Sequence, residues 1–215
     1  MKEHKNKVEL IGIYGSDETH ALSAWTSTSR DLTDEKRNRI PGLLKMLGEN
    51  FHGTPFEKSA QHFLVTSDLA SHVHILKHRI GTSVNAESAR YKELKDDKFY
   101  IPDDWADDEQ VRLIQHCETS IKQYHECLVR LVATGMPKKR AKESARFYLP
   151  YANQITADVQ FNFRSFMHFV GLRNSEHAQK EICDIAKQML VMIYETGKFN
   201  HSLEAFGWTR EKICT

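Results

Sequence analysis

The densest group of side chains suited to chemistry lies in residues 77–91. This stretch contains cations, an imidazole, hydroxyls, an amide and a carboxylate, and it follows a segment with helical apolar periodicity. Arg79 and Arg90 could each donate two charge-assisted hydrogen bonds to one phosphate group, because a guanidinium is a planar fork of donors. Lys77, His78 and Arg79 could instead cap the last carbonyls of a solvated helix end. Residue types and periodicity alone leave the anion site and the helix end equally supported.

The order of residues within this stretch separates the two interpretations. It contains, in sequence, His78-Arg79, Ser83-x-Asn85, Ser88-x-Arg90 and Tyr91. This order resembles the signature of the flavin-dependent thymidylate synthases: Arg-His-Arg, two variable residues, Ser-x-Asn, two more residues and Ser-x-Arg, commonly followed by Tyr. The chain departs from it in having Lys77 in place of the first Arg, and three residues instead of two between Arg79 and Ser83.

Three further segments resemble the same family, in the same order along the chain. Residues 52–57 resemble its His-x-Ser/Thr-Pro-Phe-Glu turn, and residues 146–150 resemble its Arg-x-x-Leu-Pro segment. Residues 162–182 resemble its C-terminal block. The resemblance therefore covers most of residues 8–195 and leaves a tail at residues 196–215 outside it.

The resemblance implies a homotetramer with FAD bound at its subunit interfaces. By resemblance, the FAD site would contain Thr54, Glu57, Lys77, His78, Arg79, Asn85, Asn162 and His168. Arg79 can neutralise pyrophosphate charge, and His78 and His168 offer flat, hydrogen-bonding rings beside the flavin or the folate. Lys77 keeps the charge of the family's Arg but loses its planar fork, so its contact need not be equivalent.

The resemblance also implies a site for deoxyuridine monophosphate (dUMP). Its residues would be His74, Glu87, Ser88, Arg90, Arg146 and Arg173. A nucleotide monophosphate carries about two negative charges at neutral pH, and each charge-assisted hydrogen bond contributes on the order of 1.5–3 kcal/mol, so two or three arginines could set the affinity. His74 stands where the family often has Gln. Ala86 replaces the family's acidic residue, and Glu87 carries a carboxylate one place later.

The implied reaction is the reductive methylation of dUMP to dTMP, a step of nucleotide biosynthesis. NADPH would reduce FAD, methylenetetrahydrofolate would supply the carbon, and flavin hydride would complete the methyl group with release of tetrahydrofolate. Other thymidylate synthases use a cysteine nucleophile, but none of the four cysteines here lies in a matching block. Ser88 has no activating base placed by the sequence, so it is assigned to substrate positioning, with Arg173 as the other catalytic residue.

The elements that must position these residues are predicted to be mostly helical. Residues 8–14 are rich in β-formers and predict an opening strand, and residues 56–66 predict a second strand after a turn at residues 52–55. Helices are predicted over residues 32–47, which contain Pro41, after a Ser67-Asp68 N-cap, from Asp107 to Gly135 and over residues 177–196.

Apolar spacing on these segments indicates the core. The helix after the N-cap carries Leu69, Val73, Leu76 and Ile80 at spacings of four and three. A stripe on residues 177–196 is expected in the core or a subunit interface, and Phe163 and Phe166 in the core. The motif match assigns no role to the tail, which could pack on a neighbouring subunit. With the resemblance, these patterns predict a helix-dominated α+β fold, a single domain over residues 1–215 with a central mixed or antiparallel sheet.

Length and composition agree with an ordinary globular protein. The chain has 215 residues and a formal net charge of +1, which gives no basic excess for nucleic acid. No stretch approaches the roughly 18 apolar residues of a membrane span, and the polar N-terminus lacks a signal-peptide pattern. Four cysteines without CxxC spacing indicate free thiols in a reducing compartment. We therefore expect a cytoplasmic protein with neither nucleic-acid nor membrane partners.

Two other functions have some support in the sequence. His72, His74 and His78 lie close together and could belong to a metal hydrolase, but the chain has no HExxH motif and no obvious carboxylate partner, so no metal is expected. The basic run at residues 138–140 could bind RNA, but it lacks a flanking aromatic platform and is more typical of a solvated helix face. The chain also lacks GxGxxG and P-loop motifs, and the resembled family binds FAD without them.

Overall fold

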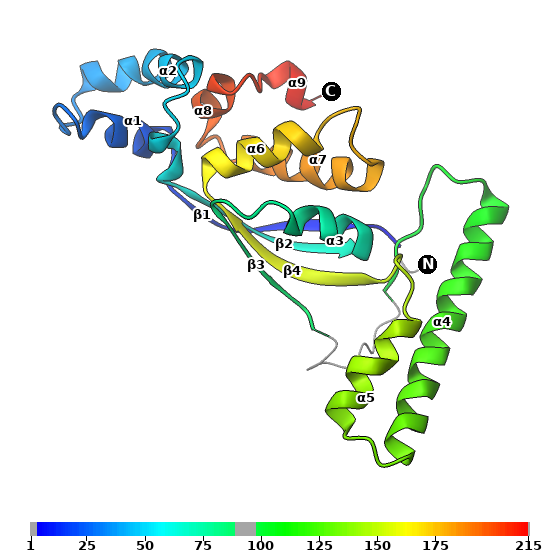
Figure 1. The fold of residues 1–215 in the computed structure, drawn as a ribbon. Coiled ribbons are helices and arrows are strands. Elements are labelled where there is room, and N and C mark those ends of the chain that lie inside the picture. Colours follow the sequence, from blue (N-terminus) through cyan, green and yellow to red (C-terminus); the bar gives the residue numbers. More distant parts are fainter. Residues whose placement is uncertain (1–3, 89–97, 215) are drawn as a thin grey trace. The chain divides into compact units, whose positions relative to one another are not determined.

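A computed structural model describes residues 4–88 and 98–214 (Figure 1). Its strands are β1 (Lys7–Tyr14), β2 (Ala60–Asp68), β3 (Thr82–Ala86) and β4 (Gln154–Phe161). Its helices are α1 (Asp17–Trp25), α2 (Asp34–Glu49), α3 (Leu69–Leu76), α4 (Asp107–Ala133), α5 (Lys138–Ala145), α6 (Phe163–Arg173), α7 (Lys180–Glu195), α8 (Asn200–Ala205) and α9 (Arg210–Cys214), with 3-10 turns η1 (Thr54–Glu57) and η2 (Arg146–Tyr148). The strands form one antiparallel sheet in the order β1-β2-β4-β3. The predicted helix-dominated α+β fold is confirmed.

Backbone contacts divide the chain into two compact units. Among the described residues, unit 1 holds residues 4–7, 65–75, 85–88 and 98–157, and unit 2 holds residues 8–64, 76–84 and 158–214. All four strands contribute residues to both units, β1 only through Lys7 in unit 1. The expectation of one domain over the whole chain stays a prediction. None of the helices in the described part of the chain has an apolar stretch long enough to cross a bilayer.

Unit 2 is built around aromatic side chains at the start of α6. Phe163 and Phe166 are fully buried, as predicted, and Phe166 packs against Phe63 of β2 and Phe161 of β4. The apolar stripe of α7 is buried too: Ile182, Ile185, Ala186, Met189 and Ile193. These contacts fix α6 over the strands, and α6 carries four of the nine residues that line the candidate site.

The C-terminal tail completes the core of its own unit. Phe199 stacks on Phe163 at 5.3 Å between ring centroids, and Phe206 contacts Phe56 edge-on at 4.9 Å. Phe199 and Leu203 are fully buried. The tail therefore packs within unit 2.

Local sequence features explain where several helices and strands begin, whether or not the sequence prediction had these boundaries. The second strand begins at Ala60, because η1 occupies Thr54–Glu57 and uses Pro55 near its start. Helix α2 runs unbroken through Pro41. Helix α3 starts at the predicted cap, where Asp68 Oδ1 accepts a hydrogen bond from Ser71 N at 2.8 Å.

The apolar spacing in α3 correctly predicted a helix, but the apolar residues that gave this pattern lie on its exposed side. Val73 is 46% exposed and Leu76 is 45% exposed, while Ser71, His72 and Ile75 are buried. The helix ends at Leu76, so Ile80 lies beyond it and is 90% exposed. Because periodicity fixes a helix and not the direction its stripe faces, the pattern could not exclude this arrangement.

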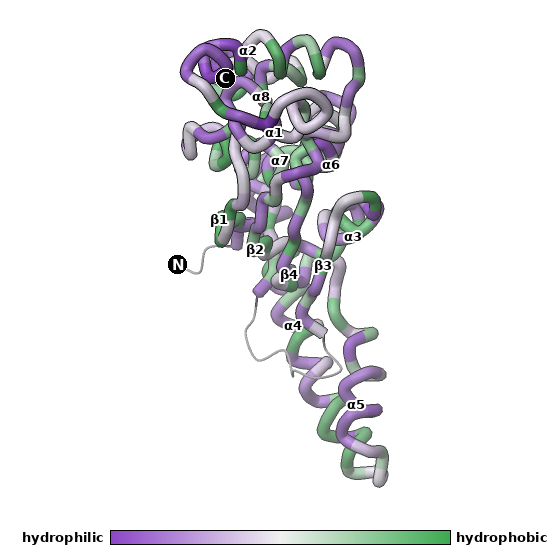
Figure 2. The backbone as a smooth tube through the Cα atoms, turned by 90° about the vertical axis from the view of Figure 1, so that its left-hand side faces the viewer, coloured by the Kyte–Doolittle hydropathy of each residue, from purple (hydrophilic) through white to green (hydrophobic). Residues whose placement is uncertain are grey.

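Unit 1 contains a helical hairpin of α4 and α5, which lie side by side (Figure 1). Polar and apolar residues alternate along both helices (Figure 2), as expected for helices with one buried stripe. Tyr124 and Leu128 of α4 pack with Ala141 and Ala145 of α5. The predicted long helix is therefore confirmed, with the small alanines of α5 allowing its close approach.

Candidate functional site

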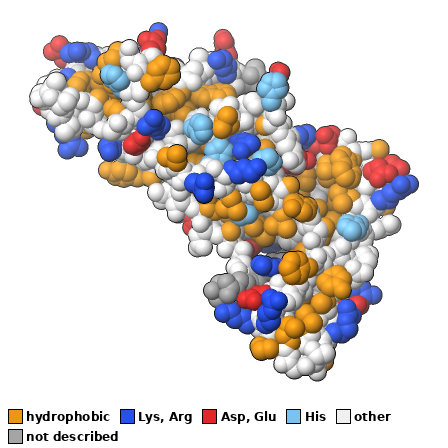
Figure 3. Space-filling view, viewed as in Figure 1, with side chains coloured by type: hydrophobic (Ala, Val, Ile, Leu, Met, Phe, Trp, Pro, Cys, Tyr) orange, Lys and Arg blue, Asp and Glu red, His pale blue; other side chains and the backbone are white. Residues whose placement is uncertain are grey.

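Unit 2 contains a cavity of about 380 Å³ that gathers many of the predicted site residues. It is lined by Lys77, His78, Arg79, Ile80, Thr82, Ser165, His168, Leu172 and Arg173. Figure 3 shows lysine or arginine side chains beside histidines in the region of α6. The helical repeat explains a third of the lining, because positions 165, 168 and 172 recur at spacings of three and four on one face of α6.

The central contact of the cavity joins Arg173 to His78. Arg173 Nε donates a hydrogen bond to His78 Nε2 at 3.0 Å. His78 must therefore be neutral, with its proton on Nδ1, because a protonated ring nitrogen has no lone pair to accept this bond. The His78 ring also lies 5.0 Å from Phe169 and 5.8 Å from His168, in edge-on arrangements. The bond orients the guanidinium of Arg173 through Nε, leaving its terminal nitrogens in the fork geometry that binds oxyanions.

Asn162 sits at the joint between β4 and α6. Its side-chain oxygen accepts a hydrogen bond from Ser165 N at 2.9 Å, which makes it the N-cap of α6. Its backbone N–H donates to Gly81 O at 2.9 Å. Asn162 was predicted to contact FAD, and the structure shows that it also fixes the start of the helix lining the cavity.

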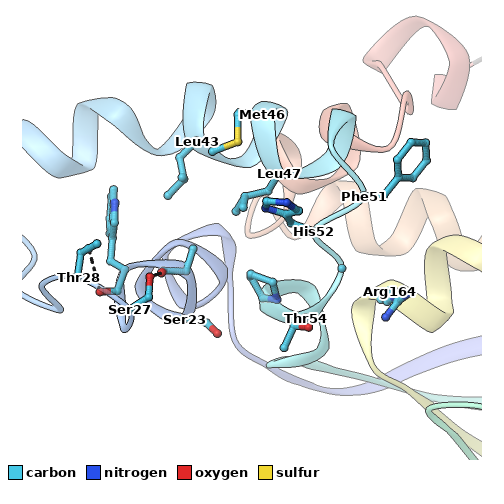
Figure 4. A pocket seen from close by; sticks show the side chains of 14 residues that line it. Ser23, Ser27, Thr28, Leu43, Met46, Leu47, Phe51, His52, Thr54 and Arg164 are labelled. Atoms are coloured by element: carbon cyan, nitrogen blue, oxygen red, sulfur yellow. Dashed lines mark hydrogen bonds between the residues drawn. The ribbon is translucent and has the colours of Figure 1, made fainter.

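A second cavity, of about 720 Å³, adjoins the turn that carries Thr54 (Figure 4). Side chains of α1 and α2, including Leu43, Met46 and Leu47, form its apolar wall, and Thr54 and Arg164 supply polar groups. The volume falls in the range of small-molecule sites, roughly 300–1,000 Å³.

Arg164 connects this second cavity to the predicted residue Glu57. Its Nη1 donates to Glu57 Oε1 at 2.7 Å, and a Cβ built on Gly53 would lie only 2.6 Å from its Nε. Gly53 therefore leaves space for the guanidinium to cross the turn. Sequence reasoning did not select Arg164, although it lies in the Asn-Phe-Arg block beside Asn162 and is a cation on the first turn of α6.

A buried polar network packs against the η1 turn. His20 is fully buried, and its Nδ1 and Nε2 lie 2.8 Å from the hydroxyls of Ser202 and Ser59 respectively. Burial lowers the pKa of His20 to about 4, so the ring is neutral at pH 7. The ring contacts Phe56 of η1 and Phe163 of α6, at 5.3 and 5.2 Å. The network therefore ties α1 to both segments that carry candidate site residues.

Asp17 closes this network on the side of α8. Its Oδ1 accepts hydrogen bonds from the backbone N–H and the hydroxyl of Ser202, and its Oδ2 accepts one from His201 N. Burial raises the pKa of Asp17, against the lowering effect of those hydrogen bonds. The network thus contains two titratable side chains, His20 and Asp17, that do not belong to the candidate site.

Unit 1 also holds several of the predicted site residues. Glu87 Oε2 accepts a hydrogen bond from Thr156 N at 2.9 Å, so its carboxylate extends the pairing of β3 with β4. Ser88 follows it and is half-buried, and Arg146 begins η2 with an exposed side chain. His74 Nδ1 is buried and has no hydrogen-bond partner among the described residues.

Three further predicted positions complete the comparison with the sequence. Asn85 lies on β3 in unit 1 with an exposed side chain. Arg90 and Tyr91 lie outside the described residues. Within the described residues, no group of three or more His, Cys, Asp or Glu side chains is placed to hold a metal ion. His72 is buried, which lowers its pKa.

Comparison with known proteins gives a consistent result. The family described as "Thymidylate synthase complementing protein" matches residues 9–196. A flavin-dependent thymidylate synthase of Thermosipho africanus is 31% identical, covering 94% of this chain and 91% of its own. One of Streptomyces avermitilis is 27% identical, over 87% and 82%. The crystal structure of the UMP/dUMP methylase PolB from Streptomyces cacaoi, bound with 5-Br dUMP, aligns with a TM-score of 0.79 and 28% identity over 96% of this chain and 97% of that one.

Proposed function

The chain belongs to the flavin-dependent thymidylate synthase family, and on that premise we propose that it catalyses the reductive methylation of dUMP to dTMP. A flavin is the cofactor of the family by name. We propose that the flavin is FAD, that NADPH reduces it and that methylenetetrahydrofolate supplies the carbon. The bound flavin would provide the hydride that a methylene group needs to become methyl.

The observation that carries this proposal is the cationic cavity of unit 2. Lys77, Arg79 and Arg173 place three positive charges around one space, and His78 and His168 add flat rings. This set fits a ligand with anionic phosphates and a planar heterocycle, which is the chemistry of both a flavin nucleotide and dUMP. Arg173, held by neutral His78, is suited to orienting an oxyanion of the substrate.

We propose the remaining contacts by position in the family pattern. Thr54, Glu57, Asn85 and Asn162 would join the cavity residues Lys77, His78, Arg79 and His168 in holding FAD. His74, Glu87, Ser88, Arg90 and Arg146 would join Arg173 in holding dUMP. Ser88 would position the nucleotide through its hydroxyl without acting as a nucleophile, since no base is paired with it in the residue pattern.

We further propose a homotetramer that completes these sites. Thr54, Lys77, Arg79, Asn85 and His168 all have exposed side chains in the single chain. Small-molecule sites commonly bury 70–90% of their ligand, so one chain alone would leave a flavin too open. The exposed Val73, Leu76 and Ile80 supply apolar surface for a neighbouring subunit. We also propose a cytoplasmic location, which the unpaired state of all four cysteines supports.

The visible absorption spectrum of the purified protein tests this function. Bands of oxidised flavin that bleach when NADPH is added under anaerobic conditions, followed by thymidylate formation from dUMP and methylenetetrahydrofolate, are the expected result. An Arg173→Ala variant should retain the flavin bands and lose thymidylate formation. A colourless protein that takes up no added FAD, with or without dUMP, would refute the proposal.

A further inference from the structure

The spacer between Arg79 and Ser83, which is one residue longer than in the resembled family, is docked onto the first turn of α6. Gly81 lies within this spacer with a φ of +63°. Its carbonyl accepts a hydrogen bond from Asn162 N at 2.9 Å. A Cβ on Gly81 would lie 2.3 Å from both Asn162 Nδ2 and Ser165 Oγ. Both the left-handed backbone and these contacts require glycine at this position.

The surface that Gly81 contacts is itself fixed. Asn162 caps α6 through its side-chain oxygen, and Ser165 is the residue whose N–H donates to that cap. The spacer therefore rests on a helix start and cannot move as a free loop would. Residues on both sides of Gly81, namely Ile80 and Thr82, line the cationic cavity together with Ser165.

We propose that Gly81 is a positioning residue that sets the separation between the cations Lys77 and Arg79 and the α6 wall of the cavity. It does so by allowing backbone contact between the spacer and α6, where any side chain would hold them apart. The extra spacer residue thus supplies a docking point and keeps the cations in reach of an anionic ligand. This inference rests on the proposed function, in which that cavity holds the flavin.

The test compares two left-handed glycines. Gly81→Ala adds a methyl group that must displace the spacer, and it should weaken FAD binding at least tenfold, measured by quenching of flavin fluorescence. Gly197→Ala is the matched control: Gly197 has a φ of +68°, but no neighbouring atom lies within 4 Å of the place that the added methyl group would occupy. The control suffers the same backbone strain and should bind FAD as the wild type does.

The kinetic readout separates positioning from general damage. Because the expected defect lies in FAD binding, the turnover of Gly81→Ala should rise towards the wild-type value as the FAD concentration is raised. A folded Gly81→Ala protein with wild-type FAD affinity, or one with lowered turnover and unchanged affinity, would overturn the inference. If the wild type itself binds no flavin, the proposed function fails instead.

A second variant keeps the inference testable if Gly81→Ala does not fold. Inserting one more glycine after Gly81 lengthens the spacer without adding a side chain and breaks the register between the cations and α6. FAD affinity should again fall at least tenfold. An insertion variant with undiminished affinity would show that the register of the spacer does not matter.

Discussion

Acid should destabilise this protein through the buried ring of His20. The ordinary pKa of 6.5 falls to about 4 in the folded chain, because the ring is removed from water. Between these two pKa values, His20 is therefore protonated in the unfolded chain and neutral in the folded chain. The stabilisation is fully present above pH 6.5 and is lost as the pH falls towards 4. At about 1.36 kcal/mol per pKa unit, the complete loss is about 3 kcal/mol.

Asp17 acts in the opposite direction over part of the same range. Its pKa is raised above 3.8 by burial, so the folded chain takes up a proton before the unfolded chain does. This contribution increases stability as the pH falls from the raised pKa to 3.8, and it partly offsets the loss caused by His20. The measured loss should therefore be smaller than about 3 kcal/mol, with its slope reduced in the acidic part of the range, where Asp17 takes up a proton.

Urea denaturation at constant ionic strength between pH 7.5 and pH 4.5 measures this effect. His20→Gln is the control, because an amide can bond the two serine hydroxyls without titrating. The free energy of unfolding of the wild type should fall with pH over this range, and that of the variant should fall less by about 2–3 kcal/mol. Parallel curves for the two proteins would refute the assignment to His20.

The candidate site gives three further predictions. His78→Phe removes the acceptor that orients Arg173, and it should raise the KM for dUMP about tenfold, consistent with a charge-assisted bond of 1.5–3 kcal/mol. Steady-state kinetics check this, and an unchanged KM would contradict it. Gly53→Ala should displace Arg164 from Glu57 and weaken FAD binding, while the free energy of unfolding changes by less than about 1 kcal/mol because the ion pair is exposed. Equal FAD affinity in a titration would count against that reasoning. Asn162→Ala should lower the free energy of unfolding by about 1 kcal/mol through loss of the N-cap, and Asn162→Asp should not. Denaturant midpoints compare the two.

Strong periodicity and motif order carried most of what could be predicted from the sequence. The stripe of α7 and the buried Phe163 and Phe166 follow from apolar spacing and are confirmed. Motif order selected Lys77, His78, Arg79 and His168 for the FAD site and Arg173 for the dUMP site, and the structure places all five around one cavity. Spacing alone could not have done this, because residues 77–79 and 168–173 are joined only by the tertiary fold.

Other features depend on contacts that one sequence does not display. Helix α1 has a polar sequence with little amphipathic character, and it is defined by the Ser16 capping box and by burial of His20 and Trp25. Arg164 was not predicted as a site residue, because its role depends on its hydrogen bond to Glu57 in the η1 turn. The role of Gly81 depends on its φ and on two side chains about 80 positions away.

The first turn of α6 has a thermodynamic consequence for ligand binding. Arg164 lines the larger cavity and Ser165 the smaller one, although the two residues are adjacent and follow the Asn162 cap closely. If a ligand in one cavity orders this turn, a second ligand in the other cavity binds to a turn that is already ordered. The second ligand then loses less conformational entropy on binding. Binding at the two cavities would then be reciprocal, each ligand raising the affinity for the other by the same factor. Order of addition would leave the final occupancy unchanged.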